Sequence, residues 1–278
     1  MIEFKDFSFR YASGKANALQ NVNLTIDDGD FVGIIGNSGA GKTTFTYAVN
    51  GIVPHHYKGD FYGAVTVNGL DTVDSKPEQL AVHVGSVFQD VDAQMVASMV
   101  EDELLFGLEN FGIPHDQIEQ RVTEALEEIG ISDLRMRDLD SLSGGQKQKV
   151  AVAAILALRP DIIVLDEPTG ELDPQSSEQI YSLLQELNRR GTTIVAVEQK
   201  IGLLCRYATK LLLIDKGCVM LYGTVREVLQ QSSRMEEIGI HVPRIVSLHK
   251  ELTRMGLVRC PAPVNMDEAE AMAKEALG

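Results

Sequence analysis

A stretch near the N-terminus has the residue types and spacing of a phosphate-binding loop. GNSGAGKTT, residues 36–44, contains the pattern G-x-x-x-x-G-K-[ST], and an apolar run, FVGII, comes directly before it. The glycines let backbone amides point at phosphate oxygens, and the start of the next helix adds a positive dipole end. We expect Lys42 to reach the β- and γ-phosphates of a nucleotide and Thr43 to offer its hydroxyl to Mg²⁺. The residues predicted to bind the nucleotide here are Gly36, Asn37, Ser38, Gly39, Ala40, Gly41, Lys42, Thr43 and Thr44.

Two acidic residues follow a second apolar run, in IIVLDEPTGELDP. Asp166 and Glu167 come at the carboxyl end of this run, where open α/β sheets place their ligands. We expect Asp166 to hold Mg²⁺ through its water shell and Glu167 to act as the general base that polarises the attacking water. On its own the pair is compatible with a surface turn. A phosphate-binding loop in the same chain favours the catalytic interpretation.

The segment LSGGQ, residues 142–146, predicts a second anion site. Ser143, Gly144 and Gly145 come directly before a helical pattern that starts at Lys147, and a helix N-terminus preceded by Ser and Gly binds anions. One domain seldom needs two phosphate sites so far apart in the chain. We therefore expect LSGGQ to serve a nucleotide held by another molecule.

The elements that position these motifs follow from the apolar pattern. IEFKDFSFRY and GAVTVNG alternate apolar and polar residues, which is typical of half-buried antiparallel strands. Continuous apolar runs are typical of strands covered on both faces of a parallel sheet; they occupy residues 31–35, 162–165, 193–197 and 210–214. Together with the phosphate-binding loop, these strands predict an α/β fold of the P-loop NTPase (nucleoside triphosphatase) type, with a RecA-like parallel core and an antiparallel β subdomain.

Helical patterns interrupt and extend this core. Between residues 115 and 131 the apolar side chains fall on one helical face, and residues 149–158 are typical of a buried helix; the face is formed by Ile118, Val122, Ala125, Leu126 and Ile129. We predict an ATPase-type domain over residues 1–232, with a helical subdomain inserted at about 92–158. Residues 233–278 are predicted to form a short helical appendage, a candidate for dimerisation.

Composition and charge argue against a nucleic-acid-binding protein and against a membrane-spanning chain. The 278 residues include 44% apolar and 23% charged residues, as in a soluble protein with a substantial core. With 25 Lys plus Arg against 40 Asp plus Glu, the net charge of −15 disfavours a nucleic-acid partner. No apolar run approaches the ~20 residues needed to cross a bilayer and the start lacks a signal-peptide pattern, so we expect an intracellular protein with three reduced cysteines.

The phosphate loop, LSGGQ and the acidic strand, in this order, resemble the nucleotide-binding subunit of ATP-binding cassette (ABC) transporters over about residues 1–230. The resemblance implies a head-to-tail dimer that binds two ATP molecules. Each ATP is then held by the phosphate loop of one subunit and the LSGGQ of the other. On this basis the nucleotide-binding set also includes Ser143, Gly144, Gly145 and Gln146.

Other positions are assigned by the same resemblance. Tyr11 matches the aromatic residue that stacks on adenine, although a tyrosine at a strand end is the plainer alternative. Gln89, in VGSVFQD, matches the glutamine that links Mg²⁺ and the attacking water to the transmembrane partner; a capping or surface glutamine is its alternative. In GELDP, Asp173 follows the family pattern, whereas Glu171 departs from the usual Ser.

The stretch VFQDVDAQMVASMVEDELLFGLEN resembles the ATPases of energy-coupling factor (ECF) importers. In these importers two ATPases, identical or different, drive a transmembrane coupling protein and a small substrate-capturing membrane protein. The resemblance implies a place on the cytoplasmic face of the membrane, with a vitamin or a transition-metal ion as cargo. The alternatives are another ABC transporter class, a soluble ABC ATPase, or a P-loop kinase or GTPase, and the last would not explain LSGGQ. His55 and His56 lack further ligands at metal-binding spacing and are assigned to a solvated loop.

Two features leave alternatives open. Gln94, Met95, Val96, Met99 and Val100 form an apolar strip that would suit a groove for a partner helix or the core of the helical region. Gln199, in VAVEQKIG, occupies the place where the ABC family usually has a His that contacts the γ-phosphate, and we predict that it is catalytic. Three explanations are open. ATP hydrolysis at this site is slow, or Glu167 is a sufficient base with a glutamine at this position, or the glutamine is an engineered substitution.

Overall fold

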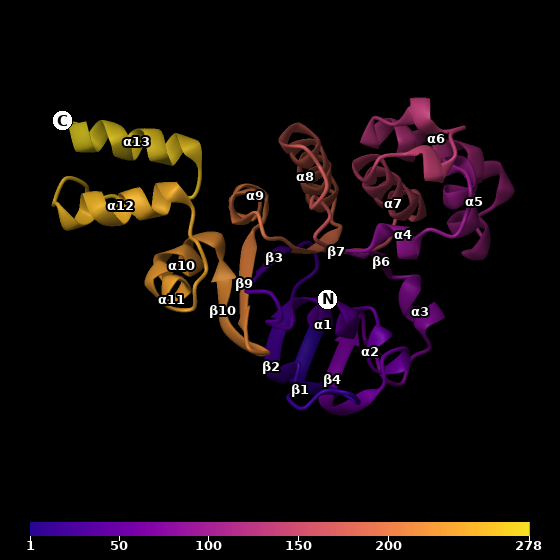
Figure 1. Cartoon of the computed structure of the whole chain (residues 1–278), viewed down its shortest axis with the longest axis horizontal. Coiled ribbons are helices and arrows are strands. Elements are labelled where there is room, and N and C mark those ends of the chain that lie inside the picture. Colours follow the sequence, from indigo (N-terminus) through magenta and orange to yellow (C-terminus); the bar gives the residue numbers. More distant parts are fainter. Residues whose placement is uncertain (278) are drawn as a thin grey trace.

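The computed structural model describes residues 1–277, and its centre is a six-stranded sheet (Figure 1). The order is β10-β9-β3-β8-β7-β6, in which only β10 is antiparallel to its neighbour. The bounds are β3 (Phe31–Ile35), β6 (Val84–Val87), β7 (Ile162–Asp166), β8 (Thr193–Val197), β9 (Lys210–Asp215) and β10 (Cys218–Thr224). Every residue of β3, β7 and β8 is buried, which confirms the prediction of strands covered on both faces.

A second sheet of four antiparallel strands lies beside this core, in the order β2-β1-β4-β5. The strands are β1 (Ile2–Tyr11), β2 (Leu19–Ile26), β4 (Gly59–Val67) and β5 (Leu70–Asp71). Helix α1 (Lys42–Val49) packs against its apolar face, where the rings of Phe4 and Phe45 stack with centroids 4.4 Å apart. The predicted α/β fold with an antiparallel β subdomain is therefore confirmed. Two short helices lie in the connections: α2 (Ile52–His55) between α1 and β4, and α3 (Pro77–Ala81) between β5 and β6.

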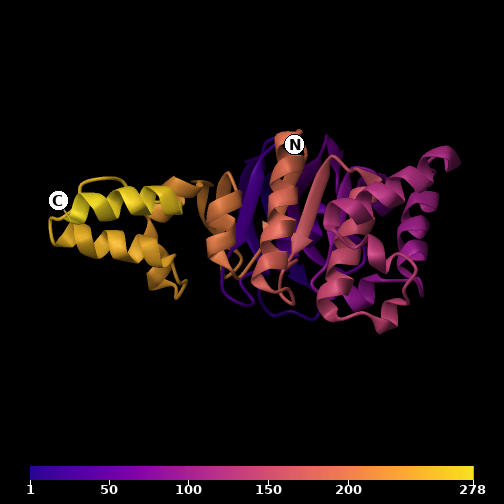
Figure 2. The same ribbon diagram turned by 90° about the horizontal axis from the view of Figure 1, so that it is seen from above.

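Helices cover the other face of the core and extend beyond its edge (Figures 1 and 2). Helices α8 (Pro174–Arg189) and α9 (Ile201–Tyr207) lie against the sheet. A further group of helices joins the sheet at β6, against which α7 packs: α4 (Val91–Gln94), α5 (Val100–Asn110), α6 (His115–Ile129), η1 (Ser132–Leu134), η2 (Leu139–Ser141) and α7 (Gly144–Leu158). The five apolar residues expected on one face of α6 are all buried, as predicted. The boundary at about 92–158 stays a prediction.

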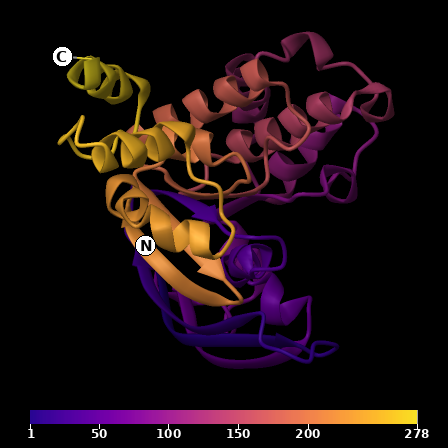
Figure 3. The same ribbon diagram turned by 60° about the vertical axis from the view of Figure 1, so that its left-hand side comes forward.

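The C-terminal part continues from β10 through α10 (Val225–Gln230) and α11 (Ser232–Glu237) into a pair of helices, α12 (Arg244–Arg254) and α13 (Met266–Leu277). These two lie side by side, away from the core (Figures 1 and 3). Arg226 of α10 binds the end of their connection and the start of α13: it donates 3.1 Å to the Ala262 carbonyl and 2.8 Å to Glu268. The predicted boundary at residue 232 stays a prediction. None of the helices within residues 1–277 is long and apolar enough to span a membrane.

Candidate functional site

The phosphate loop joins β3 to α1 and borders a cavity of about 610 Å³. Two glycines of the loop cannot be replaced without strain. A Cβ on Gly36 would clash with the carbonyl of Ile214, and Gly41 has a φ of +107°, a backbone conformation that residues with a side chain rarely adopt. Lys42 is the first residue of α1 and is almost completely buried. Its Nζ donates to the carbonyls of Gly36 and Asn37 at 2.9 and 3.0 Å, so the ammonium lies inside the loop. A cation enclosed this way suits a polyphosphate ligand.

Asp166, the last residue of β7, is only 3% exposed and is not among the residues that line the cavity. Burial raises the pKa of this carboxyl, while Thr43 and Lys42 oppose the shift. Its Oδ2 is buried and has no hydrogen-bond partner within residues 1–277. The side chain of Thr43 lies beside the Asp166 carboxyl, and Thr43 and Gln89 both line the cavity. Carboxylate, hydroxyl and amide oxygens are the type of ligand that Mg²⁺ prefers, so these residues fit the ion.

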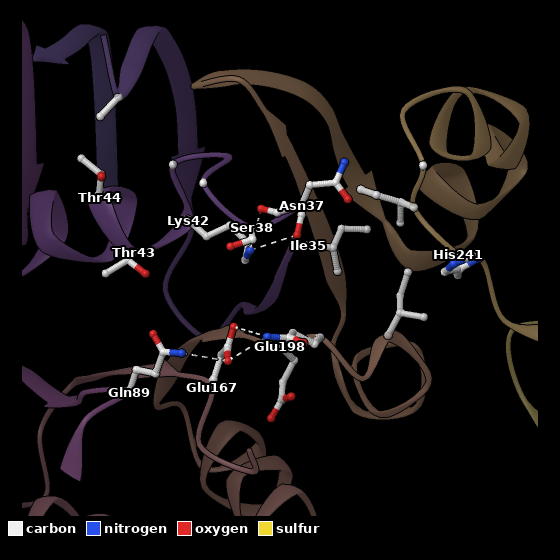
Figure 4. A pocket seen from close by; sticks show the side chains of 18 of the residues that line it. Ile35, Asn37, Ser38, Lys42, Thr43, Thr44, Gln89, Glu167, Glu198 and His241 are labelled. Carbon is white, nitrogen blue, oxygen red and sulfur yellow. Dashed lines mark hydrogen bonds between the residues drawn. The ribbon is translucent and has the colours of Figure 1, made fainter. Parts of the chain in front are cut away.

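Glu167 is held at the edge of the same cavity by residues from two other strands. Its backbone has φ +53°, and its N–H donates 3.0 Å to the carbonyl of Val197 in β8. Nε2 of Gln89, after β6, donates to Oε2 of Glu167 at 3.2 Å, and Nε2 of Gln199, after β8, donates to both oxygens at 2.9 and 3.0 Å (Figure 4). The ends of β6, β7 and β8 thus bring together the three residues that were expected to be catalytic.

Tyr11 lies at the end of β1 and also lines this cavity. Its hydroxyl is 3.0 Å from Oγ1 of Thr44, and its ring lies edge-on to Phe9 with centroids 4.9 Å apart. Burial raises the pKa of Tyr11. The structure therefore places the aromatic ring and the phosphate loop in one cavity, and the stacking role stays a prediction.

The LSGGQ segment lies elsewhere. Ser143 caps α7: its Oγ accepts from the Gln146 N–H at 3.4 Å, and its own N–H donates 3.0 Å to Oε1 of Gln146. None of residues 143–146 lines the phosphate-loop cavity, so the two predicted anion sites are separate within one chain. A Cβ on Gly144 would clash with the carboxylate of Glu171, so the residue that departs from the family pattern lies against LSGGQ of its own chain.

The apolar strip 94–100 is not one surface, which corrects the groove interpretation. Val100 is completely buried in the main core, and Gln94 bonds to the backbone: Nε2 donates 3.0 Å to the Ser86 carbonyl and Oε1 accepts from the Phe88 N–H at 2.9 Å. Val96 is 61% exposed, while Met95 packs against the core. A separate cavity of about 950 Å³ is bordered by residues 88–94, α1, α2 and α7, and Gln94 is the residue of the strip that lines it.

Two features of the site were missed at the level of sequence. The Thr169 hydroxyl donates 2.6 Å to the carboxylate of Glu198, which is buried beside Gln199; an ionisable residue at the end of the apolar run in VAVEQK was the available signal. Gly239, Ile240 and His241 also line the phosphate-loop cavity. No pattern within residues 233–245 indicates that contact.

Comparisons with known proteins place these features in a family. The family model described as ABC transporter matches residues 19–170. An ABC transporter ATP-binding protein of Pyrococcus horikoshii is 38% identical over 99% of this chain and 96% of its own length. The energy-coupling factor transporter ATP-binding protein EcfA2 of Caldanaerobacter subterraneus is 37% identical over 97% of this chain and 95% of its own length.

Solved structures agree with these relatives. cbiO1 of Clostridium perfringens, described as part of the ABC transporter complex cbiONQ, has a TM-score of 0.73 and 31% identity, covering 90% of this chain and 98% of its own. The ATP-binding cassette MJ0796, a dimer in a post-hydrolysis state bound to ADP and Pi, also has a TM-score of 0.73, with 29% identity over 81% of this chain and 99% of its own.

Proposed function

The chain belongs to the ABC transporter family and is an ATPase of that family, and from this premise we propose that it energises an importer of the energy-coupling factor type. The observation that carries the proposal is the convergence of Gln89, Glu167 and Gln199 on the phosphate-loop cavity, in a chain 37% identical to an energy-coupling factor ATPase. The cargo is a vitamin or a transition-metal ion.

In the proposed reaction, a water molecule attacks the γ-phosphorus of ATP while Glu167 accepts its proton. The bond from the γ-phosphorus to the bridging oxygen breaks, and ADP and phosphate are the products. Lys42 neutralises charge on the β- and γ-phosphates from inside the loop, and Tyr11 stacks on adenine. Thr43, Asp166 and Gln89 hold Mg²⁺, which when bound offsets the charge of the phosphate oxygens.

A second ATPase subunit completes each site in this proposal. LSGGQ does not border the phosphate-loop cavity of its own chain, so Ser143 to Gln146 are assigned to the ATP of the partner. The dimeric cassette MJ0796, at 29% identity, supports a two-subunit unit. The partner is a second copy of this chain or a related ATPase.

The cavity of about 950 Å³ is proposed as the docking groove for the transmembrane coupling protein, which works with a substrate-capturing membrane protein. Its lining combines aromatic side chains, among them Tyr47, Tyr57 and Phe88, with Asp90 and Asp92. Aromatic residues with a few polar groups in a concave surface suit a helix of a protein partner. The ATPase would then be peripheral, at the cytoplasmic face of the membrane. We retain residues 1–232 as the ATPase domain, with a helical subdomain at about 92–158 and residues 233–278 as the appendage.

Two variants test the assignment of the site. Lys42→Ala should abolish detectable ATP binding and turnover, because it removes the charge enclosed by the loop. Glu167→Gln should keep ATP binding and lower turnover by about 10²–10⁴-fold, the usual contribution of a general base. ATP titration and phosphate release measure the two effects, with the exposed Lys15→Ala as the matched control. Unchanged ATP affinity in Lys42→Ala would contradict the phosphate-loop assignment.

Co-purification tests the transport role. The chain should be recovered with two membrane proteins and a second ATPase when expressed with its cellular partners, and mass spectrometry of these partners identifies the cargo system. Recovery with ribosomes or nucleic acid, and without membrane proteins, would favour the soluble ABC ATPase instead.

A further inference from the structure

The C-terminal appendage reaches the nucleotide cavity. Nδ2 of Asn37, in the phosphate loop, donates 2.6 Å to the carbonyl of Ile238, a contact across 201 positions of the chain. The next three residues, Gly239, Ile240 and His241, border the same cavity as Lys42 and Gln199. Figure 4 shows His241 across the cavity from Gln89, on the side of Asn37. We call residues 238–241 the appendage segment.

The appendage segment has a defined conformation. Gly239 has φ +80° and its N–H donates 2.9 Å to the Glu236 carbonyl, while the N–H of Ile240 donates 2.9 Å to the carbonyl of Met235. Met235 is completely buried in the main core, and Ile238 and Ile240 pack against that core. Because both sides of the turn are held, the Ile238 carbonyl has a fixed position relative to the sheet.

The contact also has a chemical consequence for the phosphate loop. Such a loop binds phosphate through backbone N–H groups whose directions depend on the local backbone conformation. Asn37 is the first residue after Gly36, so anchoring its side chain restrains the start of the loop. His241 is exposed in the cavity, and an imidazole N–H can donate to a phosphate oxygen.

We propose that the appendage segment is a wall of the ATP site: the Ile238 carbonyl positions the phosphate loop through Asn37, and the His241 imidazole faces the bound nucleotide. This inference rests on the proposed ATP-binding role of the cavity. Because coupling between sites is reciprocal, a partner that displaces the appendage segment then changes ATP affinity, and ATP binding changes how this segment is held.

Histidine NMR on the full chain tests the position of His241. Its imidazole C–H resonance, assigned by its loss in His241→Gln, should shift when ATP and Mg²⁺ are added. The resonance of His249 should stay in place, because that side chain lies in α12 and is bonded at 2.8 Å to the carbonyl of Cys260, outside the cavity. Lys42→Ala should show no shift at either histidine.

Two glycine variants test the anchoring of Asn37. Gly239→Val forces a β-branched residue into a left-handed conformation and should displace the Ile238 carbonyl. ATP affinity, measured by calorimetry, should fall about three- to tenfold, as expected when one hydrogen bond that orders the site is lost. Gly256→Val is the matched control: φ is +73°, the space around the added Cβ is equally open, and the residue lies in the appendage outside the cavity. Its ATP affinity should equal that of the wild type.

The outcomes separate this inference from the proposed function. If the wild type binds ATP and the His241 resonance does not move, or Gly239→Val binds ATP as tightly as Gly256→Val, the inference is overturned and the ATP site stands. If the wild type binds no ATP, the proposed function fails and the inference fails with it.

Discussion

Replacing Gln199 with His should raise ATP turnover by the isolated homodimer, because the amide of Gln199 is bonded to Glu167, the proposed general base. Its Nε2 donates to both carboxylate oxygens of Glu167, at 2.9 and 3.0 Å, and Gln89 adds a bond at 3.2 Å. Glu167 must offer an oxygen lone pair to the proton of the attacking water. The amide of Gln199 therefore competes with that water for the base.

The size of the effect follows from these bonds. A hydrogen bond to a charged group contributes about 1.5–3 kcal/mol. A neutral imidazole has one N–H and replaces at most one of the two bonds from Gln199. Because Gln199 is exposed and Glu167 is partly exposed, we take the low end of the range. If losing one bond to Glu167 lowers the activation free energy of hydrolysis by up to ~1.5 kcal/mol, the rate rises by at most about tenfold. We therefore expect a three- to tenfold increase in turnover.

The assay is steady-state phosphate release from both homodimers at saturating ATP. Gln199→Ala is the control that removes both bonds without adding an imidazole. A gain in Ala at least as large as in His attributes the effect to the freed carboxylate, and a gain in His alone attributes it to the imidazole. Glu167→Gln in the His background should abolish the gain. Equal or lower turnover in Gln199→His than in the wild type would refute the idea that Gln199 limits hydrolysis.

Four further predictions concern stability, its pH dependence, thiol reactivity and assembly. Thr169→Val leaves the buried carboxylate of Glu198 without its hydroxyl donor and should lower the free energy of unfolding by about 1–3 kcal/mol in urea titrations; an unchanged value would contradict the bond. Burial raises the pKa of Glu198, so its stabilising contribution is present below the unfolded pKa and is lost as the pH rises through the folded pKa; as the pH is raised above the unfolded pKa, Glu198→Gln should therefore lose less stability than the wild type. Burial raises the pKa of Cys205 to about 12, so at about pH 8 it should react with a thiol reagent more slowly in the native protein than in urea, and equal rates would count against its burial. Ala93→Glu, in the groove, should reduce assembly with the membrane subunits and leave ATPase activity intact, whereas Val96→Glu, exposed outside the groove, should assemble normally; the same assembly by both would argue against this docking site.

The core of the fold could be predicted because its signals are local. β3 and β8 span the residues expected from their apolar runs, since a strand covered on both faces needs an apolar residue at every position. The cluster of Gln89, Glu167 and Gln199 could also be predicted from the sequence. Each follows a parallel strand, and the carboxyl ends of parallel strands meet at one edge of a sheet.

The rest depends on contacts between distant segments. The strip 94–100 has an apolar pattern, but a pattern does not specify what covers a side chain: Val100 enters the core, while Val96 stays exposed. The groove borders four separate stretches of chain, so no single window of sequence contains it. The contact of Asn37 with Ile238 uses a backbone carbonyl, a group that every residue has, and therefore leaves no trace in the residue types.

In the proposed dimer, the two departures from the ABC pattern lie at different ATP sites. Gln199 bonds to Glu167 of its own chain, beside its own phosphate loop, so it affects the ATP that this chain binds. Glu171 lies against Gly144 in LSGGQ, which is proposed to serve the ATP of the partner. In a homodimer both sites contain both departures, so Gln199→His acts twice. Beside a related ATPase with His at that position, only one of the two sites contains Gln199, and the same substitution should accelerate that site alone. Comparing the gain in turnover of the homodimer with that of the native pair therefore shows whether this chain works with a copy of itself or with a different subunit.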